Sequence, residues 1–133
     1  MTKLSFSVFA FSALSLSATH VYAADCGNAN APKPTIVEIV TFKTNTGISD
    51  ADFLKTVAAM ETSFLCKTPG FVRRTLSKGE DGTWFDYVEW ATMKEASNAM
   101  ERSIADAGAS AFVQSIAPES IAVQHWQLLS ETK

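Results

Sequence analysis

The chain has 133 residues, of which 11 are Lys or Arg, 14 are Asp or Glu, and 47% are hydrophobic. This length suits one domain and is too short for two ordinary ones. The net charge is mildly negative and no basic cluster is larger than the pair Arg73–Arg74, so a nucleic-acid partner is not expected.

The N-terminal segment is expected to lie outside that domain. Residues 1–23 begin with a short region whose only charge is Lys3, continue in an apolar run with interspersed serines, and end in "VYA". This pattern predicts a secretory signal peptide cleaved after Ala23, because the run is too short for a membrane span. The mature protein is then periplasmic or secreted, without a membrane anchor. Lipidation of Cys26 is the alternative, which the neighbouring Asp25 disfavours.

The leader and the first strand follow. Residues 24–34, "ADCGNANAPKP", are small and polar and include two prolines, so we expect a flexible leader before a single domain over residues 35–133. Residues 35–43, "TIVEIVTFK", are apolar at both parities. Such a pattern is typical of a strand that is covered on both faces.

A helix and a hairpin come next. Ser49 and Asp52 form a capping box, and the helix is expected to reach about Lys67, where "TPG" ends it. Residues 71–78 and 82–90 have the pattern of two strands joined by the turn "GEDG". In the second of them, "GTWFDYVEW", large aromatic side chains fall on both parities, so both of its faces need cover.

The last third of the chain completes the fold. Thr92 and Glu95 form a second capping box and begin a helix expected to pass Ile104, with an interruption at Gly108 and a short helix in "ASAFVQSI". Residues 120–129 form the last predicted strand. The order β-α-β-β-α-β predicts an α+β, ferredoxin-like fold, with a four-stranded antiparallel sheet and both main helices on one face.

The other face of this sheet would be bare, yet the first, third and fourth predicted strands are apolar on both parities. Burying one such side chain stabilises by about 1.5–3 kcal/mol, so several exposed together would drive association. A second copy related by a two-fold axis is the simplest cover. We therefore expect a homodimer whose sheets face each other as a dimeric α/β barrel, with a cavity between the sheet and its partner.

In these segments the chain resembles the antibiotic biosynthesis monooxygenase-like (ABM) family of dimeric α/β barrels. The resemblance covers about residues 36–129 and rests on "VEIVTFKTNTGISDADFL", "TPGFVRRTL" and "WATMKEASNAM". The family includes cofactor-independent monooxygenases and haem-degrading enzymes. The haem-degrading relatives have an Asn on strand one, a Trp at the end of strand three and a His in the region of the second helix. Trp90 matches that Trp, but the Asn position falls near Val40 and residues 92–117 contain no His. The resemblance therefore implies neither haem nor another cofactor.

The candidate catalytic residues are His125, Glu38 and Trp90. His125 is the only His outside the predicted signal peptide, and it is either a general base or a hydrogen-bonded strand residue. A single His without a cluster of other ligands also argues against a metal site. Glu38 lies mid-strand among apolar residues, where a carboxylate must be paired, solvated or protonated. It is expected either to face the cavity or to pair with Arg73 or Arg74.

The expected ligand-binding residues are apolar, aromatic or cationic and lie on the predicted strands: Val40, Phe42, Trp84, Tyr87 and Arg73. Aromatic walls suit a flat apolar ligand, although core and interface packing explain the same side chains. Arg73 either holds an anionic group of the ligand or pairs with a carboxylate across strands.

Cys26 and Cys66 are the two cysteines of the chain. In an exported protein they either form a structural disulfide or remain two unrelated thiols. The topology favours the bridge, because the first helix returns its C-terminal end to the start of strand one, within reach of the leader. We therefore expect a disulfide between them.

The leading hypothesis for function is an exported ABM-like dimer that binds a small apolar or aromatic molecule, with cofactor-independent monooxygenase activity as one outcome. The alternative is a non-catalytic periplasmic binding or structural protein whose barrel is filled by its own side chains. An open cavity of about 300 Å³ or more, reached by His125 and Glu38, would favour the first. The sequence does not determine the ligand or whether the protein is an enzyme.

Overall fold

A computed structural model describes residues 24–27 and 31–132 of the chain. The predicted signal peptide, residues 1–23, lies outside the described residues. The elements are, in chain order, β1 (Ile36–Phe42), α1 (Asp50–Ser63), η1 (Leu65–Lys67), β2 (Phe71–Lys78), β3 (Trp84–Trp90), α2 (Met93–Ala105), α3 (Ala107–Gln114), η2 (Pro118–Ser120) and β4 (Ala122–Gln127). All neighbouring strands are antiparallel, in the order β2-β3-β1-β4. The predicted α+β, ferredoxin-like fold is confirmed.

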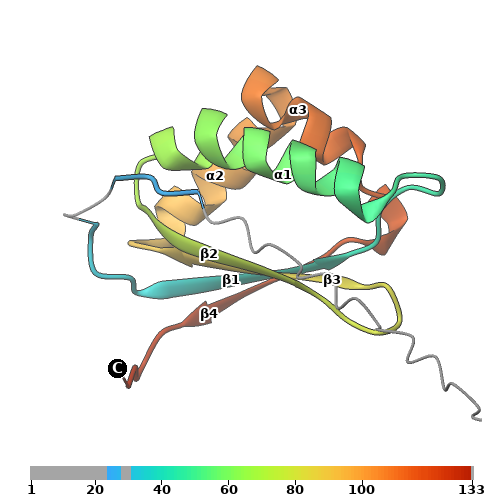
Figure 1. Cartoon of the computed structure of the whole chain (residues 1–133). Coiled ribbons are helices and arrows are strands. Elements are labelled where there is room, and N and C mark those ends of the chain that lie inside the picture. Colours follow the sequence, from blue (N-terminus) through green and yellow to red (C-terminus); the bar gives the residue numbers. More distant parts are fainter. Residues whose placement is uncertain (1–23, 28–30, 133) are drawn as a thin grey trace, which may run out of the picture.

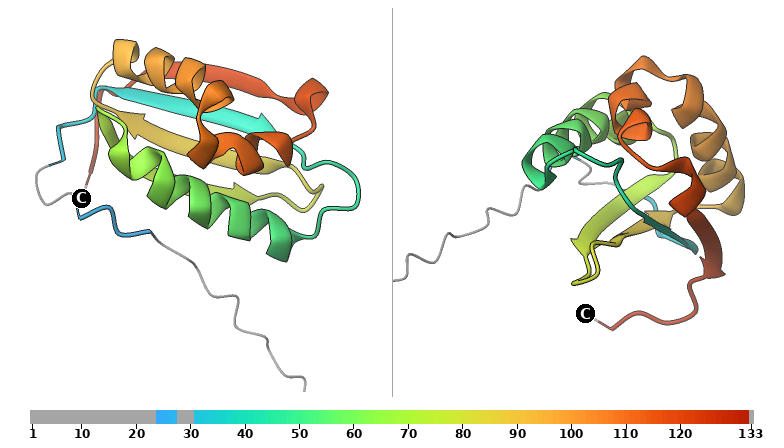
Figure 2. Two further views of the ribbon diagram at one scale, coloured as in Figure 1. Left: turned by 90° about the horizontal axis from the view of Figure 1, so that it is seen from above. Right: turned by 90° about the vertical axis from the view of Figure 1, so that its right-hand side faces the viewer.

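The molecule has two layers. The helices cover one face of the sheet, and no helix covers the other face among the described residues (Figure 1). The end-on view in Figure 2 shows the C-terminal residues leaving β4 on the side of the sheet opposite the helices. The sheet of a single chain is open, with β2 and β4 at its edges. No described helix is both long and apolar enough to span a membrane.

Both predicted capping boxes are present. The Ser49 hydroxyl accepts a hydrogen bond from the backbone N–H of Asp52 at 3.1 Å, and the Thr92 hydroxyl accepts one from the backbone N–H of Glu95 at 3.3 Å. Each bond satisfies an amide that has no partner within the first turn of its helix. The beginnings of α1 and α2 thus follow directly from short sequence patterns.

Some predicted boundaries differ from the structure. Where one helix was expected to reach about Lys67, α1 ends at Ser63 and the short helix η1 takes up residues 65–67. The break between α2 and α3 falls at Asp106 and not at Gly108, because the Asp106 carboxylate accepts a hydrogen bond from the Gly108 N–H at 2.7 Å and starts a new helix. The last strand was expected over residues 120–129. Residue 120 belongs instead to η2, and β4 is shorter at both ends, since it runs over Ala122–Gln127.

Pairing across the sheet fixes which side chains share a face. Glu38 lies opposite Val88 on β3 and opposite His125 on β4, and Val40 lies opposite Asp86. These residues face the helices. The helix-free face carries the alternate residues, which include Val37, Ile39, Arg73, Phe85, Tyr87, Glu89 and Trp126.

The core between the layers is divided into two clusters. One lies at the end of the sheet where β1 begins and includes Phe71 and Trp90. The other lies where β1 ends and includes Phe42, Phe53 and Trp84. The middle of the helix-facing sheet surface carries instead the polar side chains of Glu38, Arg74 and Asp86. Polar groups in the centre of a core require partners or a cavity.

Cys26 and Cys66 form a disulfide, as the topology predicts, with their Cα atoms 5.0 Å apart. The bridge attaches the leader to η1, directly after α1. Cys26 packs against the core cluster that contains Trp90. The described part of the leader is thereby held beside the helix layer.

Candidate functional site

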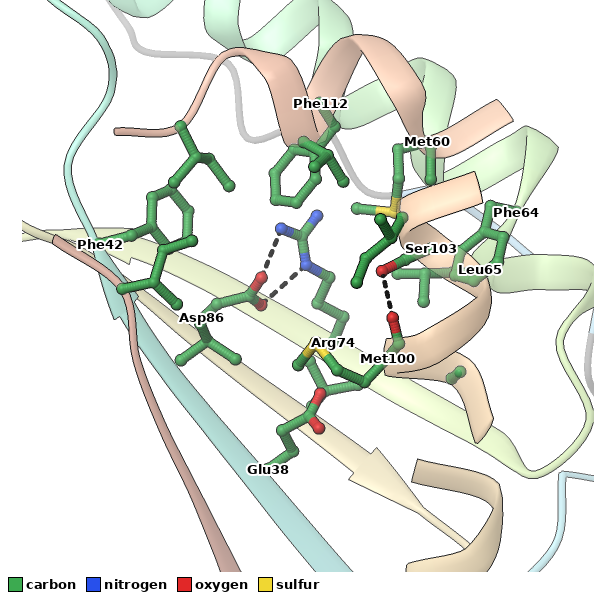
Figure 3. A pocket seen from close by; sticks show the side chains of 18 of the residues that line it. Glu38, Phe42, Met60, Phe64, Leu65, Arg74, Asp86, Met100, Ser103 and Phe112 are labelled. Carbon is green, nitrogen blue, oxygen red and sulfur yellow. Dashed lines mark hydrogen bonds and ion pairs between the residues drawn. The ribbon is translucent and has the colours of Figure 1, made fainter. Parts of the chain in front are cut away.

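A cavity of about 230 Å³ lies between the sheet and the helices (Figure 3). Residues of β1, β2 and β3 line it from below, and residues of all three α-helices line it from above. Its walls are mostly apolar and include Val40, Phe42, Met60, Phe64, Met100 and Phe112. We expected a cavity between the sheet and a second subunit. The cavity of the single chain lies on the opposite, helix-covered face, where the polar centre of the core prevents close packing.

A buried ion-pair network occupies one side of the cavity. The Arg74 guanidinium donates from Nε to Oδ1 of Asp86 at 2.8 Å and from Nη2 to Oδ2 at 2.6 Å, and Nη1 donates to Glu61 at 3.1 Å. It also lies 5.2 Å from the centre of the Phe112 ring. Burial opposes its charge, but Asp86 and Glu61 outweigh burial and raise the pKa of Arg74. The guanidinium visible in Figure 3 is therefore already committed to carboxylates.

Glu38 forms the other polar element of the cavity. Its side chain is 7% exposed, and its Oε2 lies 2.7 Å from Nε2 of His125 on the edge strand β4. Burial raises the pKa of Glu38, while the contact with His125 partly offsets this effect. The alternative pairing of Glu38 with Arg73 or Arg74 does not occur, because each arginine bonds another carboxylate.

Trp90 completes this corner of the cavity. Trp90 is 2% exposed and lines the cavity together with Glu38. The indole Nε1 has no hydrogen-bond partner among the described residues, although it lies near enough to Glu38 to lower the pKa of that carboxyl slightly. A buried donor without a partner is rare in proteins, but the indole of Trp84, which does not line the cavity, also has none among the described residues, so this feature is not specific to the cavity.

The predicted ligand-binding residues divide between the two faces. Val40 and Phe42 line the cavity. Trp84 shares their face but packs in the core, with its ring centre 4.7 Å from that of Phe53. It does not line the cavity.

Tyr87 and Arg73 lie on the helix-free face. The Tyr87 hydroxyl donates to Oε1 of Glu89 at 3.1 Å, and Arg73 donates to the same oxygen at 2.7 Å. Arg73 is thus the cross-strand partner that the sequence offered as an alternative to an anion-binding residue. Burial, and then the bond to Glu89, raises the pKa of Tyr87. Neither side chain lines the cavity. Their role in ligand binding stays a prediction, and it applies only to a ligand bound on the helix-free face.

The sequence did not single out Arg74, Asp86 and Phe112 as cavity residues. The sequence held a signal for Arg74 and Asp86. Asp86 shares its parity with Trp84 and Trp90, and a carboxylate among such residues must pair with a cation on a neighbouring strand. Phe112 had no such signal, since its position depends on how α3 packs over the sheet. Among the described residues, no group of three or more His, Cys, Asp or Glu side chains is arranged to hold a metal ion.

No family model matches the chain, and no curated protein matches it by sequence. Solved structures do match its fold. A candidate antibiotic biosynthesis monooxygenase from Bordetella bronchiseptica superposes with a TM-score of 0.60 over 74% of this chain and 100% of its own, at 19% identity. A second candidate, from Nitrosomonas europaea, gives 0.57 over 76% and 97%, at 18% identity.

SnoaB, a cofactor-independent oxygenase from Streptomyces nogalater, also superposes, with a TM-score of 0.52 over 76% of this chain and 97% of its own, at 17% identity. At such low identities the similarity is one of fold. It spans nearly the whole of each matched structure and confirms the resemblance in fold that the sequence suggested. The chain has an antibiotic biosynthesis monooxygenase-like fold.

Proposed function

We propose that the protein binds a small apolar or aromatic molecule in the cavity between sheet and helices, and that it is a monooxygenase-like protein without a cofactor. The observation that carries this proposal is an apolar cavity whose sheet side presents the buried carboxylate of Glu38. Apolar walls with a few directed polar groups are typical of small-molecule sites.

The volume limits the ligand. At about 230 Å³ the cavity is smaller than the 300 Å³ that we expected for ligand chemistry. It is nevertheless larger than the cavity of about 150 Å³ that holds benzene in an engineered protein. A ligand of one or two rings fits this space.

A reaction without a cofactor requires the ligand to supply the electrons. When a ring CH₂ group becomes a carbonyl, one atom of O₂ enters the ligand and the other leaves as water with the two hydrogens. Such a reaction begins by removing a proton from the ligand, and a buried carboxylate is a suitable acceptor. The fold shared with SnoaB, described as a cofactor-independent oxygenase, supports this reading of the Glu38 site.

Export and dimerisation belong to the same proposal. The signal-like N-terminal segment and the Cys26–Cys66 disulfide support a periplasmic or secreted protein, because disulfides persist in oxidising compartments. Phe85 and Trp126 are 39% and 56% exposed on the helix-free face. Large aromatic side chains gathered on one face support a homodimer through that face.

The test combines binding with oxygen consumption. Residues 24–133 are titrated with naphthalene-sized quinols by calorimetry, while an electrode follows oxygen uptake above autoxidation. We expect binding that Ala99→Phe abolishes, because Ala99 lines the cavity, and that the exposed Ala105→Phe on the same helix retains. Binding without oxygen uptake would support the non-catalytic alternative. Absence of binding to every probe would contradict the cavity as a ligand site.

A further inference from the structure

The Glu38–His125 pair extends from the cavity to the surface. Glu38 is 5% exposed and lines the cavity. His125 does not line it, and its side chain is 25% exposed on the edge strand β4. The 2.7 Å contact between Glu38 Oε2 and His125 Nε2 therefore joins an enclosed group to one that meets water.

The carboxylate has one oxygen left for a ligand. Oε2 is engaged by His125, and among the described residues no hydrogen bond is made to Oε1. The unpartnered indole N–H of Trp90 lies beside the same carboxylate. A hydroxyl placed here would donate to Oε1 and accept from the indole, so it would satisfy both groups.

The surrounding charges leave His125 as the basic side chain available to Glu38. Asp86 on β3 raises the pKa of Glu38, and Arg74 on β2 is held by Asp86 and by Glu61 of α1. The cavity-lining residues of α2 and α3 carry no titratable side chain. The protonation of Glu38 is consequently governed by burial, by Asp86 and by His125.

We propose that Glu38 and His125 form a proton path from the cavity to solvent, in which Glu38 accepts the proton of a bound hydroxyl and His125 serves as its solvent-side partner. The proposal rests on the proposed ligand site. The ligand O–H bond breaks, its electron pair stays on the ligand oxygen, and the proton goes to Oε1. The Glu38–His125 pair then releases one proton to water at the exposed part of the imidazole ring, so charge and atoms balance. Glu38 is a catalytic residue in this scheme, and His125 is a positioning residue.

A photoacid tests this path without knowledge of the natural ligand. 2-Naphthol has two rings and one hydroxyl, and its emission differs between the neutral and the ionised form. Light makes it a strong acid, so a probe bound away from bulk water emits as naphtholate where a base accepts the proton of its hydroxyl. We expect naphtholate emission from the wild-type complex at neutral pH.

Two variants separate the roles of the pair. In Glu38→Gln the bound probe should emit only as the neutral form at every pH below its own ionisation. His125→Gln keeps a hydrogen-bonding group but removes the imidazole that lowers the pKa of Glu38, so Glu38 should hold its proton to higher pH. Naphtholate emission at neutral pH should then be lost and return on raising the pH. In His125→Ala, added imidazole should restore the emission, which no purely structural role predicts. The control is Glu119→Gln, which replaces an exposed carboxylate.

The outcomes are distinguishable. Probe that binds but emits as the neutral form in the wild type, or a pH profile that His125→Gln leaves unmoved, would overturn the proton path and leave the ligand site intact. Probe that does not bind, measured by calorimetry, would overturn the path and the proposed function together.

Discussion

Arg74 is the residue whose removal should most disturb the core. Its guanidinium is 3% exposed and neutralises the buried carboxylate of Asp86. Arg74→Met leaves that carboxylate without a partner, and we expect a loss of about 3–5 kcal/mol in the free energy of unfolding. Urea denaturation measures the loss.

The control for this prediction is Lys55→Met. Lys55 also bonds a carboxylate, that of Asp52 at 2.8 Å, but both side chains are exposed. Exposed pairs of this kind contribute little, so no measurable change is expected. If the two variants behave alike, the Arg74 network does not stabilise the fold as its burial implies.

Glu38 should make stability depend on pH. Burial raises its pKa in the folded state, so the folded protein holds this proton more tightly than the unfolded chain does. Stability is therefore lost as the pH rises from the ordinary carboxyl range through the raised pKa. In Glu38→Gln this contribution should vanish. Urea midpoints of both proteins, measured across acidic to neutral pH, should diverge in favour of the variant; parallel curves would show that Glu38 titrates normally.

Part of the site could be predicted at this scale. Glu38 stood out as a carboxylate in an apolar strand, and Val40 and Phe42 share its parity. Tyr87, however, has the opposite parity to Trp84 and Trp90, so the five expected ligand-binding residues could not all face one cavity. The Glu38–His125 contact joins residues 87 positions apart. It depends on the register between β1 and β4, which no local pattern contains.

At the level of elements, the link between α1 and β2 depends on one glycine. Gly70 has a φ of 78°, and a Cβ at this position would overlap the side chain of Glu95, which caps α2. Gly70→Ala should cost more than the 1–2 kcal/mol that is roughly the strain of a left-handed alanine. Gly82→Ala, at φ 81° with open space around it, should cost the strain alone.

The double variant Gly70→Ala/Glu95→Ala completes this comparison. It removes the overlap with the carboxyl group but keeps the Cβ of residue 95, which would lie 2.7 Å from the new Cβ, so relative to Glu95→Ala alone its additional cost should fall but stay above that of Gly82→Ala. Thermal unfolding of the wild type and of the four variants measures these differences. Equal costs for the two single glycine variants would show that Glu95 simply moves aside.

The disulfide is the second prediction at this scale. Its cysteines are 40 positions apart, and a closed loop of this length stabilises by about 3–4 kcal/mol in the chain-entropy model. Titration of the exported, denatured protein should find no free thiol, and the double variant Cys26→Ser/Cys66→Ser should lose part of that stability. Two free thiols per chain would contradict the bridge in the cell.

The elements could be predicted because their signals are local. Capping hydroxyls, the turn "TPGF" and alternation each act within a few residues, and they place the starts of α1 and α2 and the strand β2 correctly. The volume enclosed between the layers could not be predicted. It depends on the distance at which α2 and α3 pack over Glu38, Arg74 and Asp86, and hence on how those polar groups pair. The same sequence pattern would also fit a tightly packed core.

At the scale of the whole molecule, one face of the sheet carries no helix among the described residues, and this face leads to the last prediction. Phe85 and Trp126 lie there, 39% and 56% exposed, beside the apolar side chains of Val37 and Ile39. If two such faces pair, sedimentation of residues 24–133 at micromolar concentration should give twice the mass of that 110-residue chain. The two sheets would then close the barrel that a single open sheet does not form.

Charge placed on that face should dissociate the dimer. In Phe85→Lys or Trp126→Lys a cation would be buried between the sheets, and an unpaired buried charge is costly enough to favour monomers. Met93→Lys is the matched control, because Met93 is 43% exposed but begins α2 on the opposite layer. We expect monomers from the first two variants and dimers from the third. Should the wild-type chain sediment as a monomer, the helix-free face would be a free surface, and the aromatic side chains on it would need another explanation.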